Sequence, residues 1–304
     1  MTTSQWPFII DAVRISDGKK VVVKMVPTNT DELPMIQFLN KPDLRTDKRN
    51  KMVEVIDMLL LPDTDEYALV VMPRLMLFVV IPFQFVGEVC SAFLEFLEGL
   101  SFFHEHGIAH RDACLLNMMM DSEDVTGNNF HFCQVTHTED DVTKYIQYKA
   151  RRDVAPMRYS FIDVGISKRY PLDCQDRTMS GLWGQDKTLP EFRDGISGPI
   201  DPFKTDICQL GSVFARIVQY EGLSMLSPIT TQMTLPQPEL RPTSKEVYMQ
   251  LVDLVASFTE DDLAQRVWYM ESTPAVRKRL ESGKESPPEL LKLWHCLTPY
   301  YVKK

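Results

Sequence analysis

The sequence feature that most constrains this chain is a short polar pattern in which His110, Arg111 and Asp112 are followed by Asn117. Four mostly apolar residues separate the carboxylate of Asp112 from the amide of Asn117, so both polar side chains have fixed places in one loop. A loop with these fixed ends rarely arises by accident, although a basic and acidic surface loop after a helix would have a similar composition. The patterns elsewhere in the chain decide between these two interpretations.

A second polar pattern follows a short apolar stretch. Residues 158–162 are predicted to form a buried strand, and Asp163, Val164 and Gly165 come directly after it. An Asp at the end of a strand followed by a Gly turn is common, so this pattern alone is weak. Its position after the loop that contains Asp112 makes it much stronger.

A single basic residue, Lys24, lies within an apolar, β-branched stretch at residues 21–26. An Asp-Gly turn signal precedes this stretch, so residues 8–15 are predicted to form the preceding strand of a hairpin. A Lys in an apolar strand can simply extend its ammonium group to solvent. Glu32 follows at the start of a segment with helical spacing of its apolar residues, and Asp31 beside it is an alternative partner for Lys24.

Three further charged residues lie downstream at recognisable positions. Glu191 follows a Leu-Pro pair, Asp206 opens the apolar segment 206–211, and Arg241 precedes a proline and an apolar helix. For each residue, the simple alternative is a helix N-cap or an exposed charge.

Taken in chain order, these patterns resemble the motifs of the eukaryotic protein kinase superfamily. Residues 110–117 match H-R-D-x-x-x-x-N, residues 163–165 are similar to D-F-G, and the strand around Lys24 resembles V-A-I-K. The resemblance extends from about Phe8 to about Thr259. Within this range, several stretches of the sequence are similar to those of the divergent kinase-like proteins of mushroom-forming fungi.

The resemblance implies an α+β, bilobal, protein-kinase-like fold. A small antiparallel-sheet lobe is expected at residues 1–73 and a larger helical lobe at residues 74–268, with a loop insertion at residues 122–157. A charged, partly helical tail is expected at residues 269–304. Only seven residues precede the first predicted strand, so we expect the first strand and the Gly-rich loop of the family to be missing, either by truncation or because the subgroup works without them.

The resemblance also implies a role for each polar residue. Asp112 would orient the attacking hydroxyl, and Lys24 would contact the phosphates of ATP with Glu32 as its ion-pair partner. Asn117 and Asp163 would hold Mg²⁺. The implied cofactors are therefore ATP and Mg²⁺, and the implied reaction is the transfer of the γ-phosphate to a protein hydroxyl, of Ser/Thr type.

Other residues would have supporting roles in such a protein. Met72 would lie behind the adenine, in the cofactor pocket, and Leu75 would belong to the hinge between the lobes. Glu191 and Arg241 would form a buried ion pair, and Asp206 would accept backbone N–H bonds from the loop that contains Asp112.

Three departures from the family pattern limit the expected activity. The chain has no G-x-G-x-x-G before Lys24, it has Cys114 where Ser/Thr kinases usually have Lys, and Val164 replaces a buried Phe. Three functions therefore remain possible for the protein. They are a weakly active kinase, a pseudokinase that binds nucleotide or protein partners, and a small-molecule phosphotransferase of related fold.

Composition excludes several other classes. The hydrophobic content of 44% is enough for a large core, and the net charge of −9 argues against a general nucleic-acid binder. No apolar run approaches the length of a membrane span, and the polar start lacks the features of a signal peptide. Six scattered cysteines without C-x-x-C suggest neither disulfides nor zinc.

We expect a cytoplasmic or nuclear protein whose partner is a protein substrate, with no nucleic acid and no membrane.

Overall fold

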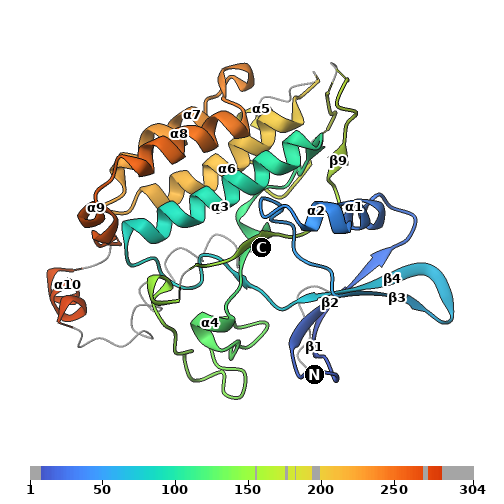
Figure 1. Ribbon diagram of the computed structural model, residues 1–304, viewed down its shortest axis with the longest axis horizontal. Helices are drawn as coiled ribbons and strands as arrows, with labels where there is room; N and C mark the ends of the chain where they lie inside the picture. The colour runs from blue at the N-terminus through green and yellow to red at the C-terminus, as the bar shows by residue number, and fades with distance from the viewer. Residues whose placement is uncertain are drawn as a thin grey trace.

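The computed structural model describes residues 8–154, 156–174, 177–181, 183–193, 199–269 and 273–282. Within them the chain is a mixed α+β protein, with small antiparallel sheets and a helical part (Figure 1). This arrangement is compatible with two lobes. We call the four-stranded sheet with its two flanking helices the sheet part, and the helices from residue 86 onward, apart from a short helix at residues 123–126, the helical part.

The sheet part is built from antiparallel strands in the spatial order β1-β2-β4-β3. Its strands are β1 (Ile9–Val13), β2 (Lys20–Pro27), β3 (Asp57–Leu61) and β4 (Thr64–Pro73). The long pairing of β2 with β4 places Lys24 opposite Val70 in the middle of the sheet. Helix α1 (Glu32–Leu39) packs on β2, and α2 (Pro42–Arg45) follows it.

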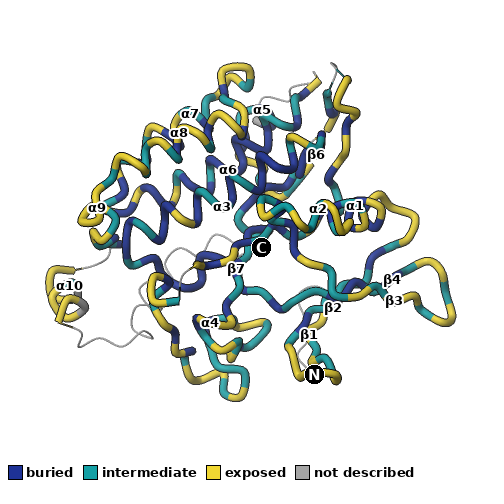
Figure 2. The backbone as a smooth tube through the Cα atoms, in the orientation of Figure 1, coloured by how far each residue is buried: buried dark blue, intermediate teal, exposed yellow. Residues whose placement is uncertain are grey.

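The helical part has α3 at its centre, packed against both α8 and the small sheet beneath it. Its helices are α3 (Val86–Glu105), α5 (Pro190–Arg193), α6 (Pro202–Val218), α7 (Ser227–Met233), α8 (Ser244–Ala256), α9 (Glu260–Ala264) and α10 (Pro274–Glu281). The rings of Phe93 and Phe214 stack with their centroids 3.6 Å apart, which joins α3 to α6. Figure 2 shows that the most buried backbone runs along α3 and α6.

Two further small sheets position the polar loops between these parts. The first has the strand order β5 (Met76–Leu77), β7 (Met118–Met120) and β8 (Tyr159–Phe161). The second pairs β6 (Ile108–Ala109) with β9 (Lys168–Arg169). The 3-10 turn η1 (Leu115–Asn117) leads directly into β7, so the loop that contains Asp112 begins and ends on a strand.

The structure agrees with most of the expected elements and corrects one. The spacing of the apolar residues in 84–107 predicts a long helix, and the structure has α3 in this range; α3 ends before Gly107, whose φ of 73° lies in the left-handed region. Asp206 does not start a helix, because α6 begins at Pro202 and is capped by the side chain of Asp201. Residues 1–7, and residues 270–272 and 283–304 of the expected tail, are outside the described residues.

Candidate active site

Five of the predicted site residues line one cavity of about 360 Å³; Asp112 and Glu32 are not among its lining residues. The sheet part contributes Lys24 and Met72, and the segment after β4 contributes Leu75. The loop regions beneath contribute Asn117 and Asp163. The cavity therefore brings together five residues that the sequence analysis placed in one site, and it has the size of a small-molecule pocket.

Lys24 is the centre of an ion-pair network at one end of the cavity. Its ammonium group bonds the carboxylate of Glu32, the first residue of α1, and lies 2.9 Å from Oδ1 of Asp163. Burial lowers the pKa of Lys24, but the carboxylates of Asp163 and Glu32 outweigh this and raise it. Burial alone would raise the pKa of Asp163, but the Lys24 ammonium group outweighs burial and lowers it. Both groups are therefore held in their charged forms.

The backbone at Asp163 is unusual for a residue that is not glycine. Its φ is 62°, in the left-handed region, where backbone strain is commonly associated with functional sites. Gly165 must come close to the ion pair, since a Cβ atom there would lie 3.1 Å from Oε2 of Glu32. The D-x-G pattern thus has a physical reason in this chain: the turn holds the Asp163 carboxylate against Lys24.

The loop that contains Asp112 is held by two side chains of α6. The carboxylate of Asp206 accepts from the backbone N–H of His110 at 2.8 Å and of Arg111 at 2.6 Å. The amide oxygen of Gln209 accepts from the N–H of Ala113 at 2.9 Å. The capping role expected of Asp206 is confirmed, and Gln209 is an additional support that sequence reasoning missed.

Asp112 and Asn117 are joined inside this loop. Nδ2 of Asn117 donates to the backbone oxygen and to Oδ2 of Asp112, each at 2.9 Å. The carbonyl oxygen of the Asn117 amide thereby faces away from Asp112 and is the atom suited to a metal ion. The described residues hold no group of three or more His, Cys, Asp or Glu side chains that could bind a metal ion. A Mg²⁺ ion that arrives on phosphates needs only one or two protein oxygens, so Asn117 and Asp163 fit it.

Gln185 contacts the carboxylate of Asp112, and no sequence signal singled it out. Its backbone N–H donates to Oδ1 at 2.7 Å, and its side-chain Nε2 donates to Oδ2 at 2.9 Å. Gly184 before it has a φ of 85°, and a Cβ atom there would lie 2.6 Å from the backbone oxygen of Arg111. A glycine followed by an amide in this segment was the only available sign. In this state Asp112 is buried, with Asn117 and Gln185 bonded to its carboxylate.

The structure shows the surroundings of Cys114 and Val164, two positions at which the sequence departs from the motifs that it resembles. Cys114 is buried, and burial together with the nearby Asp112 carboxylate raises the pKa of its thiol, so this position provides no positive charge. Val164 is buried, and the rings of Phe103 and Phe161 lie beside His110, with centroids 6.2 and 5.5 Å from the imidazole. These rings pack around His110, the residue that the usual Phe would contact.

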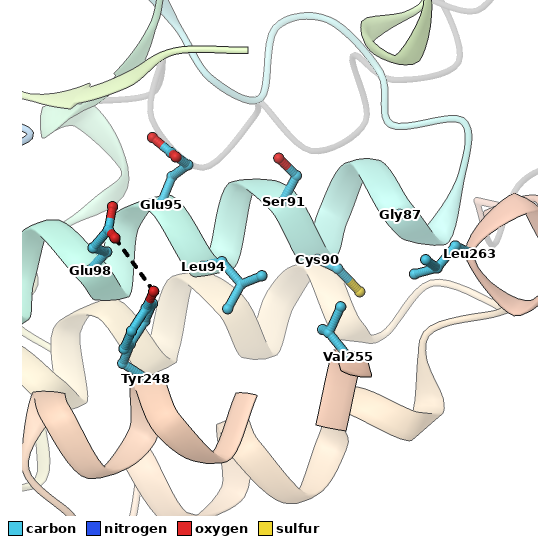
Figure 3. A pocket seen from close by; sticks show the side chains of 9 residues that line it. All are labelled: Gly87, Cys90, Ser91, Leu94, Glu95, Glu98, Tyr248, Val255 and Leu263. Atoms are coloured by element: carbon cyan, nitrogen blue, oxygen red, sulfur yellow. Dashed lines mark hydrogen bonds between the residues drawn. The ribbon is translucent and has the colours of Figure 1, made fainter. Parts of the chain in front are cut away.

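A second hollow, of about 350 Å³, lies between α3, α8 and α9 and is shown in Figure 3. It carries two acidic residues of α3, Glu95 and Glu98. The ammonium group of Lys51 lies 2.8 Å and 2.9 Å from their carboxylates, and the Tyr248 hydroxyl donates to Glu98 at 3.4 Å. In this hollow, therefore, the single ammonium group of Lys51 is shared by two carboxylates.

Comparison with protein-family models and with curated proteins finds no match for this chain. Among the described helices, none is both long enough and apolar enough to span a membrane. The case for a function therefore rests on the geometry of the cavity.

Proposed function

We propose that this protein is an ATP-dependent, protein-kinase-like phosphotransferase that moves the γ-phosphate of Mg-ATP to a protein hydroxyl at a low rate. One observation carries the proposal: Lys24, Asn117 and Asp163 line a single cavity, and Asp112 is hydrogen-bonded to Asn117 at its edge. The lining of the cavity combines these polar residues with apolar ones, among them Met72 and Leu75, as a nucleotide requires.

Each polar residue has a distinct task in this proposal. Lys24, kept charged and oriented by Glu32, neutralises phosphate oxygens, and Asp112 accepts a hydrogen bond from the attacking hydroxyl. Asn117 and Asp163 would hold Mg²⁺, which when bound neutralises charge on the phosphates. The catalysis required of the protein is positioning and electrostatic stabilisation, and this set of side chains can provide both.

The low rate follows from what the site lacks around the transferred phosphate. Cys114 is a buried, neutral thiol where the family has a cation. Loss of a single preorganised donor of this kind costs roughly 10²–10³ in rate. Binding of the nucleotide depends more on Lys24 and the apolar end, so we expect measurable affinity with weak transfer.

The Asp163→Ala variant tests the proposal. We expect it to abolish Mg²⁺-dependent ATP binding in calorimetry, because the variant lacks a direct oxygen ligand and leaves Lys24 with one carboxylate fewer. Asp253→Ala is the matched control, since it removes the same charge from an exposed position of α8. If Asp163→Ala binds Mg-ATP as tightly as the parent, the assignment of the site is wrong.

A second candidate, a nucleotide-binding module without transfer, is favoured by the contacts of Asp112. Gln185 engages both carboxylate oxygens, so an incoming hydroxyl must compete with it.

Hydrogen bonds to charged groups contribute about 1.5–3 kcal/mol, and we therefore expect Gln185→Ala to raise the transfer rate about tenfold. The exposed Gln237→Ala is the control. A slower Gln185→Ala enzyme would mean that Gln185 positions Asp112 instead of blocking it.

A further inference from the structure

The insertion at residues 122–157 is a folded unit with its own hydrogen bonds. It begins with helix α4 (Glu123–Thr126) and returns on itself, since the N–H of Lys149 donates to the oxygen of Val125 at 3.0 Å. Within it, the N–H of Ile146 donates to the oxygen of Thr136 at 3.0 Å, and Phe130 is fully buried. Figure 1 shows this segment, in green around α4, near the sheet part and away from α8.

Glu139 fixes the insertion to the sheet part. Its carboxylate bonds the ammonium group of Lys20 on β2 and lies 3.2 Å from the guanidinium of Arg74, which directly follows β4. Burial raises the pKa of Glu139, but Lys20 and Arg74 outweigh this effect and lower it. Both cations also donate to the backbone oxygen of Asn128. Arg74 is itself buried, and its guanidinium lies 4.5 Å from the centre of the Phe130 ring.

The anchored segment reaches the cavity of the proposed active site. Phe130, Phe132, Cys133 and Val135 all line it, together with Lys24 and Asp163. Phe130 is buried and belongs to the core of the insertion, whereas Phe132 and Val135 are only half-buried. Their free surface therefore faces the space that a ligand would occupy.

We infer that the insertion is a fixed wall of the nucleotide site, in which Phe132 and Val135 make apolar contact with the bound nucleoside. The inference rests on the proposed function and adds binding residues to it. An aromatic ring and a branched aliphatic side chain suit a flat heterocycle, because they bury its surface without requiring hydrogen bonds. The salt bridges of Glu139 preorganise this wall, so little ordering is required when the nucleotide binds.

Cys133 provides a direct test because it is exposed and lies in the same wall. The protein is treated with iodoacetamide in the presence and absence of Mg-ATP, and modification of each cysteine is followed by peptide mass spectrometry. We expect Mg-ATP to slow alkylation of Cys133 about tenfold and to leave Cys174, which lies outside this cavity, unchanged. Calorimetry under the same conditions shows whether the nucleotide is bound.

The outcomes separate the wall from the proposed function. Mg-ATP that binds without protecting Cys133 overturns the wall and leaves the proposed function intact, whereas no binding by the parent overturns both. Phe132→Ala is expected to weaken Mg-ATP binding about tenfold, while Val142→Ala, at an exposed apolar position of the same insertion, leaves it unchanged. Glu139→Gln, in which Phe132 is unchanged, is also expected to weaken Mg-ATP binding. Unchanged affinity in Phe132→Ala and Glu139→Gln, with unchanged melting temperatures, would contradict the inference.

Discussion

Replacement of Glu191 by alanine is expected to lower the free energy of unfolding by about 3–5 kcal/mol, because Arg241 would be left charged and buried without its partner. The side chain of Arg241 is 0% exposed and that of Glu191 is 4% exposed. Their contact is bidentate, with Nη1 on Oε1 and Nη2 at 2.9 Å from Oε2. The buried pair expected from the sequence is thereby confirmed, and it joins α5 to the segment that precedes α8.

Chemical denaturation of the parent and the variant measures this effect. Glu239→Ala is the matched control, since Glu239 lies two residues before Arg241 but is exposed. We expect the control to stay within about 0.5 kcal/mol of the parent. A Glu191→Ala protein that unfolds at the same denaturant concentration as the parent would show that the pair contributes little to stability.

Replacement of Asp112 by asparagine is expected to reduce phosphate transfer to a generic protein substrate by about 10²–10⁴-fold. The amide has the shape of the carboxylate, but it cannot take the proton of the acceptor hydroxyl. Nucleotide affinity should change little, because Asp112 is not among the residues that line the cavity. Equal background signals from the parent and the variant, with ATP still bound, would leave the nucleotide-binding module as the function.

Much of the site was predictable because its parts are set by local spacing. Asp112 and Asn117 are five residues apart in one loop, and Asp163 lies two residues after the end of β8, the strand that pairs with β7. For Lys24 the sequence leaves two possible ion-pair partners, Glu32 and Asp31. The structure selects Glu32, which is the first residue of α1 and is buried, whereas Asp31 is exposed.

The contacts that the sequence did not reveal depend on tertiary structure. Gln185 lies 73 residues from Asp112, and no periodicity or charge pattern links the two. The sequence predicts only a loop insertion at residues 122–157, and the place of this segment at the cavity depends on the contact of Glu139 with Lys20, 119 residues away. Packing of this kind is determined by the assembled fold, so local patterns carry little information about it.

The central claim is that the cavity around Lys24 binds Mg-ATP. Titration of ATP into the parent protein by calorimetry, with Mg²⁺ and again with the metal removed by a chelator, tests it most directly. We expect saturable binding in the presence of Mg²⁺ and much weaker binding without it, because Asn117 and Asp163 would reach the phosphates through the metal. Absence of binding under both conditions, or equal affinity with and without Mg²⁺, would contradict the account.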